Sequence, residues 1–158
     1  MKFSDFVSTQ SICAELSSTD KPSVIAELVD SLVKAGEING SDRDDIIKAI
    51  MKREDLGSTG IGRGIAVPHT KHASVPKLVG TVGVSIEGVD FESLDGEKVQ
   101  LFFLLVSPPD RPGDHLRALE NISRQLRDDT FCRFLKQSKN TEDIVQLLEE
   151  ADNNQFVS

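Results

Sequence analysis

The residue best suited to chemistry in this sequence is His69, which ends a glycine-rich run that begins at Gly57. A short apolar segment (65–67) and Pro68 precede it, so the spacing predicts an imidazole held rigidly at a strand end. Neutral imidazole is a good nucleophile near neutral pH, because its ordinary pKa is about 6.5. The alternative is a histidine whose ring is satisfied by a backbone carbonyl at the start of a loop.

The loop before His69 favours a phosphate as its ligand. Its glycines, Gly60 among them, let the backbone approach an anion closely. The hydroxyls of Ser58 and Thr59 are further donors, and Arg63 adds positive charge. Phosphoryl transfer needs mainly positioning and charge stabilisation. We therefore predict that His69 is phosphorylated.

His115 is the second candidate, because it follows Pro112-Gly113-Asp114 at the expected start of a helix. Its side chain is predicted to point inward, since it shares a helical face with three apolar residues, Leu119, Ile122 and Leu126. If this helix start faces His69, its free amides and positive dipole end also attract a phosphate. Two alternatives stay open: His115 as a core histidine, and Asp114 as a helix cap only.

Arg53 lies at the charged end of the helix expected before the loop. Most arginines in such a stretch are solvated surface residues. Its position is nevertheless close enough to the loop for a bidentate guanidinium contact with a phosphate. Arg63 has the same ambiguity.

Three other kinds of site fit this sequence poorly. A Walker A loop or a dinucleotide fingerprint must open a helix, whereas residues 60–64 lead into a strand. A metal site built from His69, His72 and His115 has no placed carboxylate or cysteine partner. His72 is predicted to be a surface neighbour, and we expect neither a metal nor a cofactor.

Composition excludes several function classes. A formal net charge of -8, with acidic residues spread along 158 residues, argues against nucleic-acid binding. Cys13 and Cys132 lack a C-x-x-C spacing, so neither a disulfide framework nor a cysteine zinc site is indicated, and a reducing cytoplasm fits best. The longest apolar run, 101–106, is far shorter than the roughly 18 residues of a membrane span, and no signal peptide is evident.

Hydrophobic periodicity predicts an α/β fold with layers of helices on both faces of a sheet. Strands are expected at 65–67, 82–86 and 99–106, the last nearly all apolar and therefore covered on both faces. Helices are expected from Asp20 to Gly36, from 41 to about Gly57, over 114–126, and from about 130 and 141. The segment before Asp20 fits either a strand or a helical turn. We expect one domain over residues 1–150 and a frayed polar tail over 151–158.

Two stretches carry a family resemblance. Residues 53–62 read Arg-Glu-Asp-Leu-Gly-Ser-Thr-Gly-Ile-Gly, and residues 64–69 read Gly-Ile-Ala-Val-Pro-His. Together with 99–106 and 114–116, they closely resemble the EIIA component of the bacterial phosphotransferase system, fructose/mannitol type. Residues 56–62 look most like the nitrogen-regulatory subfamily.

The resemblance implies a central mixed sheet of about five strands flanked by helices. It implies that His69 accepts a phosphoryl group from HPr or its nitrogen-branch counterpart, with His115 hydrogen-bonding the phosphate and Arg53 supplying positive charge. No cofactor is implied. The family often has glycine or alanine where this sequence has Thr70, a larger residue that could alter docking or donate to the phosphate.

Three roles are compatible with this resemblance. In the regulatory role, the phosphorylation state of His69 controls a partner protein. In the transport role, the chain passes its phosphoryl group to an EIIB protein for sugar uptake. In the third, the domain binds a partner without being phosphorylated. The sequence carries no fused EIIB or HPr, which favours the regulatory role.

Overall fold

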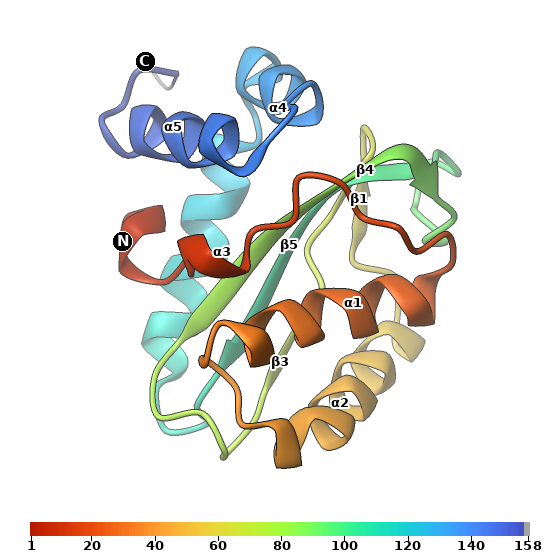
Figure 1. Ribbon diagram of the computed structural model, residues 1–158, viewed down its shortest axis with the longest axis vertical. Helices are drawn as coiled ribbons and strands as arrows, with labels where there is room; N and C mark the ends of the chain where they lie inside the picture. Colours follow the sequence, from red (N-terminus) through yellow and green to blue (C-terminus); the bar gives the residue numbers. More distant parts are fainter. Residues whose placement is uncertain (157–158) are drawn as a thin grey trace.

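A mixed β-sheet organises the computed structural model, which describes residues 1–156. Strand β5 is central: it runs parallel to β2 and β3 on one side and antiparallel to β4 on the other, while β1 pairs with β2 (Figure 1). The five strands are β1 (Gly60–Gly62), β2 (Ile65–Ala66), β3 (His69–Lys71), β4 (Val79–Val89) and β5 (Val99–Ser107). The predicted mixed sheet of about five strands is confirmed.

Helices cover both faces of this sheet, as its central strand requires. Leu101, Phe103 and Leu105 of β5 share a core with the C-terminal helices, whereas Phe102 and Leu104 share one with the N-terminal helices. The first group comprises α3 (Pro112–Gln125), α4 (Asp129–Lys136) and α5 (Thr141–Asp152), and the second α1 (Lys21–Lys34) and α2 (Arg43–Asp55) (Figure 1). Alternate side chains of a strand point to opposite faces, so a doubly covered strand is apolar throughout.

The helix starts follow the capping residues in the sequence. The carboxylate of Asp20 accepts a hydrogen bond from the Ser23 amide at 2.9 Å at the start of α1. Asn140 caps α5 in the same way, by accepting from the Asp143 amide at 2.9 Å. The helix predicted near residue 130 begins at Asp129. No helix in residues 1–156 combines the length and apolar character needed to cross a bilayer.

The N-terminal segment contains both helical turns and extended stretches, the two conformations that its sequence allowed. Two short 3-10 helices, η1 (Phe3–Asp5) and η2 (Thr9–Ser11), alternate with extended stretches that bridge to the outer edge of β4. The ring of Phe3 stacks on Phe103 with centroids 5.6 Å apart. The segment therefore both lines the edge of the sheet and closes the core beneath it.

The predicted tail differs from the structure over its first residues. Helix α5 continues to Asp152, and Ala151 is fully buried. The carboxylate of Asp152 accepts from the amides of Phe3 at 2.7 Å and Ser4 at 3.0 Å, which joins the two ends of the chain. These contacts anchor a stretch that looked frayed because its partners are 148 or more residues away. Residues 157 and 158 of the predicted tail lie outside the described residues.

Candidate functional site

His69 is the first residue of β3, where the sheet fixes its backbone. It pairs with Leu105 of β5, whose amide donates to the Pro68 carbonyl at 3.0 Å. The half-buried ring places Nδ1 2.8 Å from the carbonyl oxygen of Val67. Because a carbonyl can only accept, Nδ1 carries the proton and Nε2 keeps its lone pair. The backbone-carbonyl contact that was the alternative role for His69 therefore exists, and it leaves Nε2 available as a nucleophile.

His115 lies beside His69, in the first turn of α3. Its ring centroid is 5.4 Å from that of His69, and its side chain is buried, with 5% exposure. The predicted inward orientation is confirmed. Burial, together with the nearby charges of His69 and Lys71, lowers the pKa of His115 to about 4. His115 is therefore neutral at physiological pH.

Two residues of this site were missed by the sequence reasoning. Ser107, the fully buried last residue of β5, has its hydroxyl 2.5 Å from Nδ1 of His115. Lys71 pairs with Ser107 and shares a face of β3 with His69, two positions earlier. Lys71 could have been predicted, because residues two positions apart on a strand share a face. Ser107 could have been predicted as the polar residue that ends the apolar run 101–106.

Arg53 lies in the last turn of α2, on the sheet face opposite α3. Its guanidinium donates to the Gly57 carbonyl at 2.9 Å, and within residues 1–156 it hydrogen-bonds to neither histidine. Strand β3 ends the sheet on its side of β5, so Arg53 would approach His69 around a free edge. Its predicted role in the phosphate site stays a prediction.

The glycine-rich loop does not present the free donors that were predicted for a phosphate. The Thr59 amide lies 3.2 Å from both carboxylate oxygens of Glu54, and the Thr59 hydroxyl donates to the same carboxylate. The Ser58 hydroxyl donates to the Phe91 carbonyl at 2.7 Å and accepts from the Gly60 amide at 3.0 Å. The expectation that Ser58, Thr59 and Gly60 hold a phosphate is corrected: the anion on this loop is the protein's own Glu54.

Arg63 is also engaged elsewhere. Its backbone is left-handed at φ 58, in the turn between β1 and β2, and its side chain reaches across to the start of α4. There it binds the Asp129 carboxylate at 2.7 Å and the Leu126 carbonyl at 2.5 Å. The suggested phosphate role of Arg63 is therefore corrected to a tertiary contact.

Thr70 points away from the two histidines. It pairs with Val106, which packs with α1 and α2, whereas His69 pairs with Leu105 on the α3 side. The hydroxyl of Thr70 lies 3.4 Å from the Lys71 carbonyl. Because alternate residues of a strand face opposite sides, the suggested phosphate donation by Thr70 is corrected.

His72 and Asp114 are held by local polar partners. The ring of His72 bonds to Asp45 of α2 through Nε2 at 2.5 Å and to Ser74 through Nδ1 at 2.6 Å. Both of its nitrogens are thus used away from the other two histidines. Asp114 does not cap α3 but pairs with Arg117 in the next turn. The suggestion that Asp114 is the helix cap is corrected.

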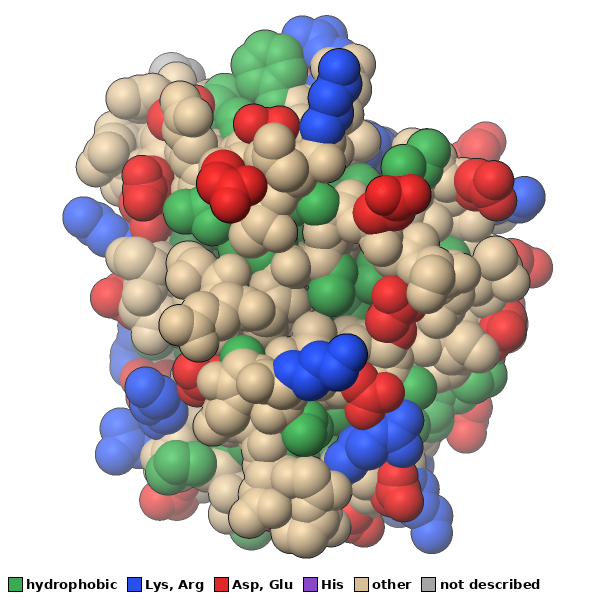
Figure 2. Space-filling model, in the orientation of Figure 1, with side chains coloured by type: hydrophobic (Ala, Val, Ile, Leu, Met, Phe, Trp, Pro, Cys, Tyr) green, Lys and Arg blue, Asp and Glu red, His purple; other side chains and the backbone are tan. Residues whose placement is uncertain are grey.

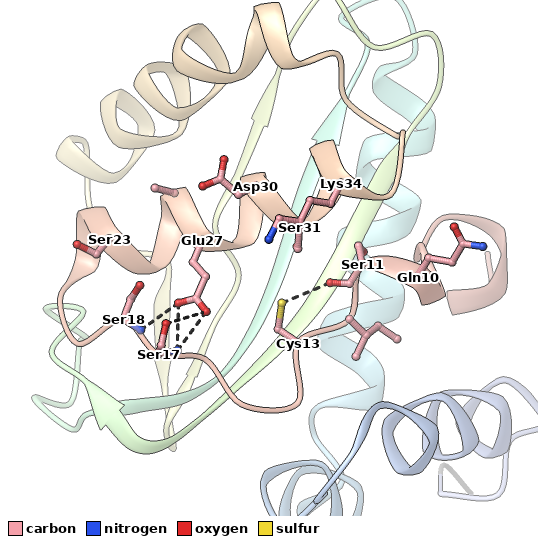
Figure 3. Close-up of a pocket in the computed structure, with 12 residues that line it drawn as sticks. Gln10, Ser11, Cys13, Ser17, Ser18, Ser23, Glu27, Asp30, Ser31 and Lys34 are labelled. Carbon is pink, nitrogen blue, oxygen red and sulfur yellow. Dashed lines mark hydrogen bonds between the residues drawn. The ribbon is translucent and has the colours of Figure 1, made fainter.

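A separate groove of about 610 Å³ lies between α1 and the N-terminal segment (Figure 3). Its central carboxylate, Glu27, accepts from the Ser18 amide at 2.9 Å and the Ser17 amide at 3.1 Å. Burial raises the pKa of the Cys13 thiol in this groove, which keeps it in the unreactive protonated form. Acidic and basic side chains are interspersed on this face of the molecule (Figure 2). Among the described residues that line the groove, the Cys13 thiol is therefore no match for His69 as a nucleophile.

The geometry of the histidine pair supports phosphoryl chemistry. In both rings Nδ1 is held by the protein, and neither Nε2 has a hydrogen-bond partner within residues 1–156. A partly exposed imidazole with a free lone pair then stands next to a buried neutral imidazole. Such a pair can accept a phosphoryl group and hydrogen-bond its oxygens.

Comparison with known proteins identifies the family. The family described as phosphoenolpyruvate-dependent sugar phosphotransferase system, EIIA 2, matches residues 5–151. The chain belongs to this family. A nitrogen regulatory protein from Bradyrhizobium diazoefficiens is 34% identical to this EIIA chain over 148 residues, which cover 94% of the chain and 95% of the relative.

A second relative is a longer protein, of which this chain matches only a part. The fructose-specific EIIABC component of Bacillus subtilis is 36% identical over 152 residues, which cover 96% of this chain but only 24% of that protein. Among solved structures, nitrogen regulatory protein IIA-Ntr from Neisseria meningitidis superposes with a TM-score of 0.82 at 26% identity, covering 91% of this chain and 97% of that one. Mannitol IIA from Escherichia coli, at 22% identity and a TM-score of 0.74, covers 89% and 97% and shares the fold.

Proposed function

We propose that this EIIA chain is a phosphocarrier that accepts a phosphoryl group on Nε2 of His69 from a phosphohistidine of an HPr-type donor. The single observation that carries the proposal is the Nδ1–H to Val67 carbonyl bond, which leaves the Nε2 lone pair free. That lone pair attacks the donor's phosphorus, the donor's P–N bond breaks, and the donor ring leaves as a neutral imidazole that keeps its other proton. No external base is needed, and Nδ1 of His69 stays protonated.

His115 and two cations support the transferred group in this proposal. If the Ser107 hydroxyl donates to Nδ1 of His115, the proton of that neutral ring lies on Nε2 and can be donated to a phosphoryl oxygen. The first turn of α3 adds its positive dipole end. Lys71 on the same face, and Arg53 around the edge of β3, supply positive charge to the transition state.

The proposal is tested by incubating the chain with a phosphorylated HPr-type donor. Wild type is expected to gain one acid-labile phosphate and His69→Ala none, whereas His115→Ala is expected to be labelled but to transfer poorly. Wild-type labelling of His69→Ala would overturn the assignment. No labelling of folded wild type by HPr or by its nitrogen-branch counterpart would instead favour a binding domain that is not phosphorylated.

The output of the phosphorylated form is proposed to be regulatory. One relative that this chain spans almost end to end is a nitrogen regulatory protein. The phosphoryl group would add about two negative charges to the histidine face, which changes partner binding. The chain would act in the cytoplasm as one EIIA domain, which accords with the free thiols of Cys13 and Cys132.

The second candidate function is a relay to an EIIB protein. It is favoured by the fructose-specific relative and by a structural neighbour solved as mannitol IIA in complex with phosphorylated mannitol IIB. Mixing the phosphorylated chain with candidate EIIB proteins separates the two functions. Rapid and complete discharge onto one EIIB would contradict a purely regulatory role, while slow discharge onto all of them would support it.

A further inference from the structure

A buried ion pair joins the start of α1 to the end of α2. The ammonium of Lys21 lies 2.9 Å from the Glu54 carboxylate, and the two side chains are 11% and 1% exposed. The same ammonium lies 4.7 Å from the ring centroid of Phe91. Burying two charges costs free energy that a single ion pair often does not recover, so stability alone explains this pair poorly.

The helix dipoles do not favour either charge within its own helix. Glu54 lies in the last turn of α2, where a negative charge is unfavourable, and Lys21 lies in the first turn of α1, where a positive charge is. Each charge is favourable instead toward the other helix, and Glu54 also bonds to the loop between α2 and β1. Thr59 of that loop and Gly60, the first residue of β1, are both buried.

A line of hydrogen bonds runs from this ion pair to the ring of His69. The Glu54 carboxylate accepts from both the amide and the hydroxyl of Thr59. The Thr59 carbonyl accepts from the Val67 amide at 3.1 Å, and the Val67 carbonyl accepts from Nδ1 of His69 at 2.8 Å. The amide of Val67 is therefore hydrogen-bonded to the loop, and its carbonyl is hydrogen-bonded to the ring of His69.

We propose that Glu54, held in place by Lys21, is a positioning residue for His69. Its carboxylate fixes Thr59, Thr59 fixes Val67, and the Val67 carbonyl keeps the ring proton on Nδ1 and the lone pair on Nε2. This inference rests on the proposed phosphocarrier function for its importance, although its geometric content does not depend on phosphorylation. Groups that orient a metal-ligating imidazole commonly change activity by about tenfold or more when removed, and we expect an effect of the same order here.

The test is the tautomer of His69 in Glu54→Gln, read from the nitrogen shifts of the 15N-labelled chain by NMR near pH 8. A glutamine keeps the shape but replaces one carboxylate oxygen with an amide donor, so the separate oxygens that face the Thr59 hydroxyl and the Lys21 ammonium cannot both be kept. We expect wild type to hold the proton on Nδ1 and Glu54→Gln to show a mixture of tautomers. Phosphorylation of Glu54→Gln at saturating donor should be about tenfold slower, with half-saturation changed by less than about twofold.

Asp30→Asn is the matched control. It breaks the other ion pair between α1 and α2, that of Asp30 with Arg43, at the opposite ends of these helices. We expect its His69 tautomer and phosphorylation rate to equal those of wild type. An unchanged tautomer and rate in folded Glu54→Gln would overturn the proposal, and so would an equal change in Asp30→Asn.

Thr59→Val provides a second test that keeps Glu54 and Lys21 in place. It removes only the hydroxyl donor to Glu54, so we expect a smaller shift of the tautomer in the same direction, and recovery in Thr59→Ser. If Glu54→Gln does not fold, the absence of any shift in Thr59→Val overturns the proposal. Because the tautomer is measured without a donor, this result stays distinct from a failure of the phosphocarrier function.

Discussion

The rings of His69 and His115 lie 5.4 Å apart, centroid to centroid, at an interplanar angle of 56°, and each is held by a protein partner at Nδ1. The two rings come from different elements, the first residue of β3 and the first turn of α3, which meet at the C-terminal end of β5. Because both rings are oriented before any ligand arrives, little ordering is left to occur during phosphoryl transfer.

The burial of His115 makes stability depend on pH. Its pKa is about 4 in the folded chain and about 6.5 when unfolded, so the unfolded state binds more protons between these values. The stabilisation from neutral His115 is complete above about pH 6.5 and is lost as the pH falls toward 4. We expect the free energy of unfolding to fall by about 2 kcal/mol from pH 7 to pH 5 through this residue.

Urea denaturation of wild type and His115→Gln at both pH values checks this prediction. Glutamine can keep a hydrogen bond to Ser107 but does not titrate, so this part of the pH dependence should disappear. His72→Gln is the control and should retain it. An equal pH dependence in wild type and His115→Gln would show that burial of His115 does not govern acid stability.

The contact between Ser107 and His115 should contribute to both stability and transfer. Ser107→Ala leaves Nδ1 of a buried ring without its partner, and we expect a loss of about 1–2 kcal/mol in unfolding free energy together with slower transfer. Ser85→Ala is a matched control, because the Ser85 hydroxyl is also buried and accepts from the Gly88 amide at 3.1 Å. Thermal unfolding measures the stability of both variants, and kinetics with the phosphorylated donor should show slower transfer in Ser107→Ala alone. An equal loss of rate in Ser107→Ala and Ser85→Ala would argue against a specific role of Ser107 in transfer.

Arg53 should matter for transfer more than for folding. We expect Arg53→Gln to lower the phosphorylation rate by on the order of tenfold to a hundredfold, because a charge near the transferred group is lost. Arg53→Lys should recover part of the rate, since the charge is kept but the bidentate fork is not. Lys52→Gln, at the exposed neighbouring position, is the control for net charge. A wild-type rate in Arg53→Gln would remove Arg53 from the site.

Arg63 should show the opposite behaviour. Arg63→Ala removes the bonds to Asp129 and to the Leu126 carbonyl, and we expect a loss of about 1 kcal/mol, most of it from the carbonyl bond because the ion pair is exposed. The phosphorylation rate should not change. Rate measurements and urea denaturation of the same variant separate the two effects, and a slowed transfer without lost stability would return Arg63 to the phosphate site.

The parts of the fold that the sequence predicted well depend on local pattern. The doubly buried strand 99–106, the cap at Asp20 and the inward position of His115 all follow from periodicity or capping within a few residues. The anchoring of Asp152 by the N-terminus was missed, because no local signal reports a contact between the two ends of the chain.

The glycine-rich loop binds an anion, as its motif predicts, but not the phosphate that we expected. The pattern predicted an anion near Thr59, and an anion is there, but it is the Glu54 carboxylate from within the same motif. Sequence spacing cannot tell whether a loop binds an external ligand or a side chain of its own protein. The same limit applies to Arg63, whose partners are 63 and 66 residues away.

The most direct measurement is to phosphorylate the 15N-histidine-labelled chain with an HPr-type donor and to identify by NMR which ring nitrogen is bonded to phosphorus. We expect one phosphohistidine, with phosphorus on Nε2 of His69 and the proton still on Nδ1. Phosphorus on Nδ1 of His69, or on His115, would contradict it.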